Sequence, residues 1–385
     1  TISDLICDGC LRSKNVDCGK GINPAKLMPT IKKATKSIEK RIKRNNPVSE
    51  GEKWLYENFY LIYRYVYSRK DDLKSLPHIN DLPRIVFIAK GIVNNSLDTL
   101  TGERVRKILS SVNDRVLLRY DELMQFNNAI YYALTEQAYI LARRILRQHA
   151  MESDAEKFIP TLFNSDVYLY FLMKNKKLSD KKSDYLRKKG ISEKKVTTNY
   201  NKTILYNATL AKTVFVGMRE AESFVTAEYN VKFLGSYKIL AEKFDLESVS
   251  VNTLKDYFSV ISDISKSCGA DEDYVAEKAA EIAVNNDKDI STVLFDYKRE
   301  LKRAVKKDKI PTLKPKYGLW KQRMYVLSII LPSLCGAACI AAFFNVGIGV
   351  LSFVPLVFIA ENLINYALNG IVKDKRAPEK NAKTV

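Results

Sequence analysis

Three cysteines near the start of the chain are the residues whose type and spacing come nearest to a metal site. Cys7 and Cys10 form a Cys-x-x-Cys pair, and Cys18 follows them. Structural zinc takes four such ligands, but the sequence has no second Cys-x-x-Cys pair, and His78 and His149 lie far away along the chain. Cys7, Cys10 and Cys18 are therefore weak candidates, and we predict no metal site.

Paired carboxylates could bind a divalent metal or move protons in a group-transfer reaction. Asp287 and Asp289 have the spacing of a metal motif found in enzymes that use nucleotide sugars, but Asp289 is better placed to cap a helix. Asp271 and Asp273 are expected in the first turn of another helix, where the helix dipole favours acidic groups. The sequence also has no glycine-rich phosphate loop and no serine or cysteine with a recognisable histidine partner. We therefore assign no catalytic residue.

A polar stripe is predicted inside the most apolar part of the chain. Within residues 325–371, Glu361 is the only charged residue, and Asn365 and Asn369 follow it at four-residue steps. This spacing places the three side chains on one helix face, with Asn362 beside them. The stripe predicts either hydrogen bonds that join membrane helices or a functional polar surface inside the membrane.

The apolar run itself predicts a transmembrane hairpin. Residues 325–344 and 350–371 each supply the ~20 residues that a helix needs to cross a bilayer, and residues 345–349 are expected to form the turn. Basic residues flank both outer ends and none lies in the turn. The positive-inside bias therefore predicts a multi-pass protein of the inner (cytoplasmic) membrane, with residues 1–324 on the cytoplasmic side.

The formal net charge of +19 requires partners of opposite charge. Just before the hairpin, each basic residue can gain about 1 kcal/mol from anionic headgroups, so we predict contact with anionic lipid and not with nucleic acid. Two other basic runs, residues 32–44 and 174–195, are interpreted as solvated loops or helix faces. The predicted lipid contacts are Lys302, Arg303, Lys306, Lys307, Lys309, Lys314, Lys316, Lys321 and Arg323.

The rest of the sequence predicts helices, so the expected fold class is all-α, a helical soluble body followed by a two-helix transmembrane hairpin. Ser49 and Glu52 form a capping box that begins a helix, whose tyrosines are interpreted as core residues. A long helix is expected over residues 120–151, and Ser153 with Glu156 predicts the start of another. No alternating strand pattern is evident.

These elements predict an order of regions along the chain. A polar tail after the hairpin and a start on Thr1 suggest that the chain is part of a longer polypeptide. The predicted regions are a basic cysteine-containing leader (1–46), a helical subdomain (47–172), a basic linker or excursion (173–198), a second helical subdomain with the juxtamembrane basic segment (199–324), the transmembrane hairpin (325–371) and a tail leading to a further domain (372–385).

Several short segments occur in an order that resembles a known family. They are residues 52–62, 82–85, 120–123, 134–137, 216–219, 246–250, 256–264 and 271–279. In this order they are similar to the amino-terminal region of the cyclic β-1,2-glucan synthases. The resemblance implies a parent enzyme that transfers glucose from UDP-glucose to a growing glucan, with a divalent metal. Both ligands would belong to a catalytic domain after residue 385, so no cofactor is expected in this segment.

The resemblance implies that this chain is a non-catalytic region. It would anchor and position the catalytic domain of the same polypeptide, and the stripe around Glu361 would line a path for the glucan or contact that domain. The alternative is a stand-alone membrane-tethered helical adaptor. Such an adaptor would bind anionic lipid through its basic segment and a protein partner through its tyrosine-rich faces.

Overall fold

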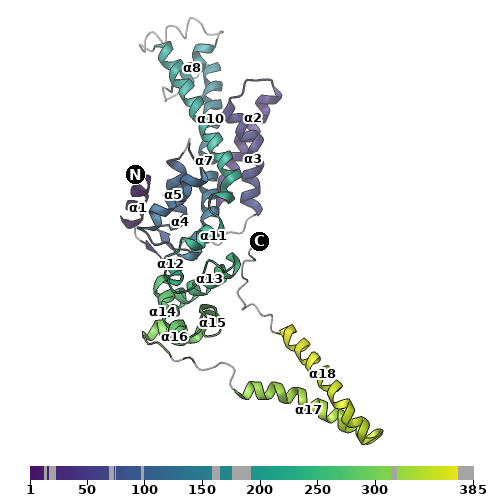
Figure 1. The fold of residues 1–385 in the computed structure, drawn as a ribbon. Coiled ribbons are helices and arrows are strands. Elements are labelled where there is room, and N and C mark those ends of the chain that lie inside the picture. The colour runs from purple at the N-terminus through teal and green to yellow at the C-terminus, as the bar shows by residue number, and fades with distance from the viewer. Residues whose placement is uncertain are drawn as a thin grey trace. The chain divides into compact units, whose positions relative to one another are not determined.

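The computed structural model describes residues 1–12, 15–16, 23–68, 73, 75–96, 99–157, 165–175, 192–311, 313 and 319–371. In these residues the chain forms 17 α-helices, one short 3₁₀ helix and three strands of two residues each (Figure 1). The predicted all-α class is confirmed. The chain divides into two compact units, Thr1–Leu234 and Gly235–Val385.

Unit 1, Thr1–Leu234, consists of helices and one very small sheet. The strands β1 (Asn15–Val16), β2 (His78–Ile79) and β3 (Leu82–Pro83) pair antiparallel in the order β1-β2-β3. The helices are α1 (Ile2–Arg12), η1 (Pro24–Leu27), α2 (Met28–Lys43), α3 (Glu50–Ser68), α4 (Arg84–Asn94), α5 (Gly102–Asn113), α6 (Tyr120–Met124), α7 (Phe126–Glu156), α8 (Asp166–Lys174), α10 (Glu193–Phe224) and α11 (Ala227–Lys232).

The long helix α7 forms the spine of unit 1, and α2, α4, α8 and α10 pack against it. Leu134, Leu141 and Ile145 are buried on its apolar face. The predicted new helix at residues 153–156 is wrong, because these residues form the last turn of α7. Ala155 belongs to the same apolar cluster as residues of α8 and α10, and this packing keeps the turn helical.

Helix α3 begins as the capping box predicts, but four of its five tyrosines are exposed, and only Tyr65 is buried. The backbone N–H and the hydroxyl of Ser49 each donate to Glu52 Oε2 at 2.6 Å. Because α3 packs against α2 and α10 on one side only, its opposite face meets solvent (Figure 1). The exposed fractions on that face are 38% for Tyr56, 57% for Tyr60, 46% for Tyr63 and 53% for Tyr67.

Helix α10 belongs to unit 1, since it packs against α3, α7, α8 and α5. Its backbone passes so close to α3 that a Cβ added at Gly51 would lie 2.9 Å from the carbonyl oxygen of Asn207. The boundary between the two units therefore falls between Leu234 and Gly235, and not in the predicted linker at residues 173–198. Residues 176–191 of that linker lie outside the described residues.

Unit 2, Gly235–Val385, contains a group of short helices and two long apolar ones. Asp289 stands at the N-cap of α15, and the buried Tyr297 stands at the N-cap of α16. The helices are α12 (Gly235–Ala241), α13 (Val251–Cys268), α14 (Glu272–Asn285), α15 (Ile290–Phe295), α16 (Lys298–Lys307), α17 (Leu319–Phe343) and α18 (Val346–Ile371).

Candidate functional site

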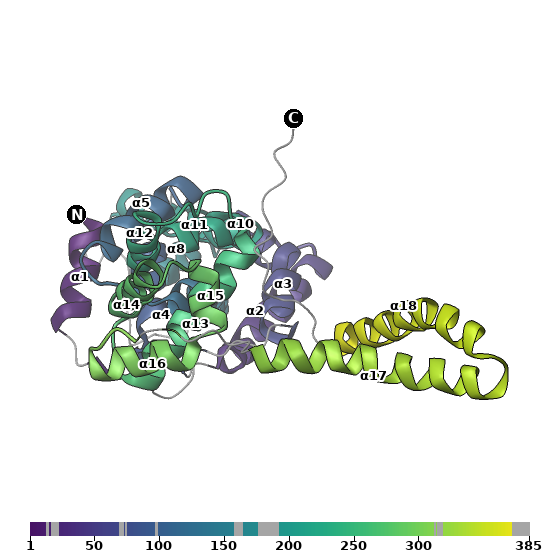
Figure 2. The same ribbon diagram turned by 60° about the horizontal axis from the view of Figure 1, so that its bottom comes forward.

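Helices α17 and α18 pack side by side as a hairpin (Figure 2), and both are long and apolar enough to cross a membrane. The turn is shorter than predicted, because Asn345 Oδ1 accepts the backbone N–H of Gly347 at 2.9 Å and α18 already begins at Val346. Gly349 allows the close approach of the two helices. A Cβ at this position would lie 2.8 Å from Ala341 Cα.

The predicted polar stripe lies on α18. Glu361 is half-buried, and Asn362 is exposed. The amide nitrogen of Asn362 donates to the carbonyl oxygen of Phe358 at 2.9 Å, one turn earlier in the same helix. The side chains of Asn365 and Asn369 lie outside the described part of the chain. A shared role for the stripe therefore stays a prediction.

Helix α16 carries the described part of the predicted lipid-contact segment. Leu301, Ala304 and Val305 are buried on one face of α16. The basic residues occupy the rest of its surface and the residues after it: Lys302 is half-buried, while Arg303, Lys306, Lys307 and Lys309 are exposed. The side chains of Lys314, Lys316, Lys321 and Arg323 lie outside the described residues. The described cations are thus available to a headgroup layer.

Cys7 and Cys10 are buried in α1. Burial raises the pKa of the Cys7 thiol, and it raises the pKa of Cys10 to about 11, so both thiols are protonated at pH 7. Cys18 lies outside the described residues. Within the described residues, no group of three histidine, cysteine or acidic side chains could hold a metal ion.

The acidic pairs are helix ends, as predicted from the sequence. Asp271 occupies the N-cap of α14, and Asp273 lies in the first turn. Burial raises the pKa of Asp273. Asp287 adopts a left-handed turn conformation with φ of 49°, and Asp289 is the N-cap of α15. Neither pair has the features of a nucleotide-sugar metal site.

A serine with a histidine partner does exist, contrary to the prediction. Ser37 Oγ of α2 lies 2.9 Å from His149 Nδ1 of α7. On the other side of the ring, His149 Nε2 is hydrogen-bonded to Glu52 Oε1 of α3. His149 lies 112 positions after Ser37 and 97 positions after Glu52. No local motif could have indicated the trio, because three different helices supply it.

Arg41 forms an ion pair next to this trio. Arg41 of α2 donates through Nη1 to Glu152 Oε2 of α7 at 2.6 Å, and its Nε lies 4.0 Å from Glu52 Oε1. Burial raises the pKa of Glu52, but hydrogen bonds from His149 and Ser49 outweigh it and hold the pKa below its ordinary value. Glu52 is therefore an anion at pH 7, and because it can only accept, the hydrogen on His149 lies on Nε2.

The trio has the residue types of a hydrolase triad but not its surroundings. Ser37 lies in the middle of α2, where the backbone N–H groups are used by the helix and cannot form an oxyanion hole. In the neutral imidazole, Nδ1 accepts the hydroxyl hydrogen of Ser37. The chemistry that this geometry supports is the positioning of one hydroxyl group.

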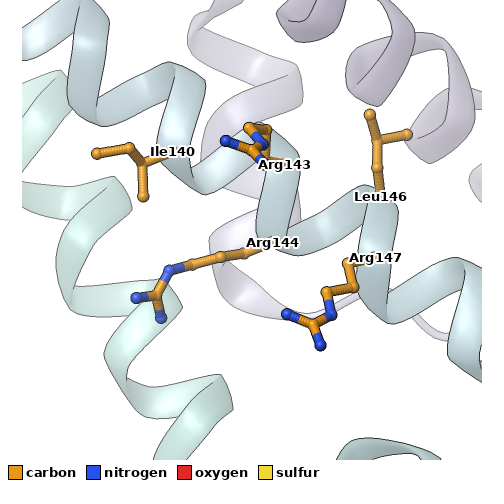
Figure 3. A pocket seen from close by; sticks show the side chains of 5 residues that line it. All are labelled: Ile140, Arg143, Arg144, Leu146 and Arg147. Atoms are coloured by element: carbon orange, nitrogen blue, oxygen red, sulfur yellow. The ribbon is translucent and has the colours of Figure 1, made fainter. Parts of the chain in front are cut away.

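Ser37 also lines an open pocket between α2 and α7. This pocket has a volume of about 580 Å³, and its lining is Pro29, Lys32, Lys33, Lys36, Ser37 and Lys40 of α2 with Leu146 of α7. A second open pocket of about 460 Å³ is lined by Ile140, Arg143, Arg144, Leu146 and Arg147 (Figure 3). Since Leu146 lines both pockets, we call them together the α2–α7 groove.

The arginines of the groove lie on the exposed face of α7. In Figure 3, Arg144 and Arg147 extend to the same side of the helix, whereas Leu146 points the other way. The guanidinium carbon of Arg144 lies 4.5 Å from the ring centre of Tyr206, and that of Arg143 lies 5.8 Å from the ring centre of Tyr139. The sequence run at residues 32–44, interpreted as a solvated face, is thus one wall of a basic groove.

No protein-family model and no curated protein matches this sequence. The functional interpretation therefore depends on the geometry of the chain itself.

Proposed function

We propose that this chain anchors a helical body to the inner membrane, with residues 1–324 on the cytoplasmic side. The observation that carries the proposal is the apolar hairpin. Its two apolar segments are 19 residues each, with mean hydropathy 2.2 and 1.9. At 1.5 Å per residue each is about 28 Å long, close to the ~30 Å of a hydrocarbon core.

The outward face of the hairpin supports this proposal. Phe343 is 85% exposed and Leu351 is 78% exposed, and both belong to a continuous apolar surface on α17 and α18. A large exposed apolar surface is unfavourable in water, and it is covered by a partner or by lipid. A bilayer would cover both helices along their full length. The basic residues of α16 would then lie near anionic headgroups.

We further infer that the anchored body positions the catalytic domain of a cyclic β-1,2-glucan synthase-like glucosyltransferase. The support is the order of the resembling segments, most of which fall on helices, among them α3, α7, α10, α13 and α14. UDP-glucose and a divalent metal would bind to the catalytic domain, because the acidic pairs in this chain lie at the starts of helices. Glu361 would face the glucan or neighbouring membrane helices.

A membrane-tethered adaptor is the second candidate, and one observation favours it. Four tyrosines of α3, Tyr56, Tyr60, Tyr63 and Tyr67, are exposed along one helix face. Tyrosine is enriched in protein interfaces, because its ring supplies apolar area and its hydroxyl a hydrogen bond. These tyrosines would contact the protein partner of the adaptor.

Membrane anchoring has a direct test. The chain is expected to stay in the membrane fraction after alkaline carbonate washing. A thiol introduced by Asn345→Cys in the turn should react with a membrane-impermeant maleimide added outside, while Lys309→Cys should react only after permeabilisation. The unchanged chain is labelled in parallel, and the label on its own cysteines gives the background signal. Release by carbonate would refute the anchor, and labelling of Lys309→Cys from outside would refute the orientation.

The glucosyltransferase proposal is tested with the whole polypeptide. Membranes that carry it should incorporate glucose from UDP-glucose into glucan, and deletion of residues 1–324 should abolish this incorporation because the catalytic domain loses its support. If the whole polypeptide incorporates no glucose, the adaptor is favoured. If the deleted form keeps full activity, the body has no positioning role.

A further inference from the structure

The α2–α7 groove combines more positive charge than its surroundings neutralise. Lys32, Lys36 and Lys40 follow one another at four-residue steps, which places them on one face of α2. Within the described residues, no carboxylate forms an ion pair with Lys33, Lys36 or Lys40. By contrast, Arg41 on the same helix is paired with Glu152 at 2.6 Å. The groove therefore has more cations than carboxylates, although Arg41 on the same helix is neutralised by Glu152.

This excess charge has an energetic cost. Like charges at four-residue spacing, as in Lys32, Lys36 and Lys40, destabilise a helix. Lys32 is held over the rings of Tyr63 and Tyr67, with its ammonium 5.4 Å and 5.3 Å from the ring centres. An anion in the groove would relieve the repulsion. Its binding would therefore stabilise the folded chain.

The groove also contains a neutral polar group with a fixed position. Ser37 is held by His149, and the ring of His149 is in turn held by the buried Glu52. Because its single hydrogen is donated to His149 Nδ1, the Ser37 hydroxyl is not a donor to a ligand, and the lysines supply the donors of this groove. Leu146 lies between the two pockets and offers an apolar contact beside the charges.

From these observations we propose that the α2–α7 groove binds phosphate groups of an organic phosphate. Lysines act as point charges for phosphate, and arginines donate two hydrogen bonds to it. A ligand with two neighbouring phosphates matches a groove whose cations are divided between two adjoining pockets. The phosphate could be a lipid headgroup or a free diphosphate, since both present the same oxygens. This site is independent of the proposed anchoring function.

The test uses the full chain in nanodiscs of neutral phosphatidylcholine, with inorganic pyrophosphate as the probe. Binding is measured by calorimetry and by the rise in the midpoint temperature of unfolding. We expect Lys33→Gln, Lys36→Gln and Lys40→Gln together to weaken pyrophosphate binding by about tenfold or more, since three charge contacts are lost. Without pyrophosphate, the same variant should unfold at a temperature equal to or above that of the unchanged chain.

The matched control removes the same charge elsewhere. Arg303→Gln, Lys306→Gln and Lys307→Gln in α16 change the net charge equally but lie in the other unit. This variant should bind pyrophosphate within about twofold of the unchanged chain, because its three changed residues do not line the groove. If both triple variants bind as tightly as the unchanged chain, or lose affinity equally, the groove is not the site and the proposal is overturned.

A second pair of nanodiscs distinguishes the two sources of phosphate. If a lipid headgroup occupies the groove, discs with phosphatidylglycerol should slow acetylation of Lys33, Lys36 and Lys40 and weaken pyrophosphate binding. If the ligand is a free phosphate, these lysines should be acetylated at the same rate in both discs. Only added pyrophosphate should then slow their acetylation. If neither phosphatidylglycerol nor pyrophosphate slows acetylation of these lysines, the proposal is overturned. Tighter binding of single-stranded RNA than of pyrophosphate through the same lysines would also overturn it.

Discussion

Replacing Glu122 by leucine is expected to destabilise unit 1 by about 3–5 kcal/mol, because it leaves a buried arginine without its counter-charge. Glu122 is fully buried, and its two oxygens accept from Arg84 Nε at 2.9 Å and Arg84 Nη2 at 2.5 Å. The backbone N–H of Arg119 donates to the same carboxylate at 3.0 Å. Burial lowers the pKa of Arg84, but the bonds to Glu122 outweigh it and hold the pKa above its ordinary value.

The measurement is chemical denaturation of the full chain in mild detergent, with hydrogen exchange of the amides in α4 and α6 to assign the change to unit 1. The control is the double variant Arg84→Met with Glu122→Leu. It should recover at least half of the lost stability, because an apolar pair of similar volume needs no counter-charge. A double variant as unstable as Glu122→Leu alone would contradict this explanation.

Replacing Glu52 is expected to cost about 2–4 kcal/mol at neutral pH, since three donors lose their acceptor. The donors are His149 Nε2, the Ser49 backbone N–H and the Ser49 hydroxyl. The pKa of Glu52 in the folded chain is lower than its ordinary value of 4.5. Protons therefore bind the unfolded state more tightly. The stability that Glu52 contributes is complete above about pH 4.5 and is lost as the pH falls through the folded-state pKa.

The measurement compares Glu52→Gln with the unchanged chain in denaturation experiments from pH 7 down to pH 3. The difference between them should be largest at pH 7 and should shrink below pH 4.5. Glu50→Gln is the matched control, because Glu50 lies two residues earlier on the same helix and is exposed. It should change stability by less than about 0.5 kcal/mol. A difference for Glu52→Gln that stays constant down to pH 3 would contradict the assigned ionisation.

Local sequence patterns were sufficient for much of the fold. Thr101 caps α5 through a hydrogen bond from the backbone N–H of Arg104, as its position before an apolar helix pattern predicts. The uninterrupted apolar run likewise predicted two helices of membrane length, because length and composition are all that such a helix needs. These features depend on interactions between residues at most a few positions apart.

Sequence patterns gave wrong predictions where tertiary packing decides between structures that share the same local pattern. The tyrosines of α3 widen its apolar surface, and this pattern predicted burial on most sides. The structure places α3 where neighbours cover only one side, so Tyr60 and Tyr63 are exposed. Ser153 and Glu156 have the residue types of a capping box, but burial of Ala155 favours continuation of α7.

The sequence by itself determined the helical class, the main caps and the apolar hairpin, because helix periodicity and capping act within one or two turns. The basic run at residues 32–44 remained open between a loop and a helix face. The tertiary structure places it in α2 (Met28–Lys43), and it brings Ser37, His149 and Glu52 together. The periodicity of a helix determines which of its residues share a face, but the packing of α2 against α7 and α3 determines which distant residues that face meets.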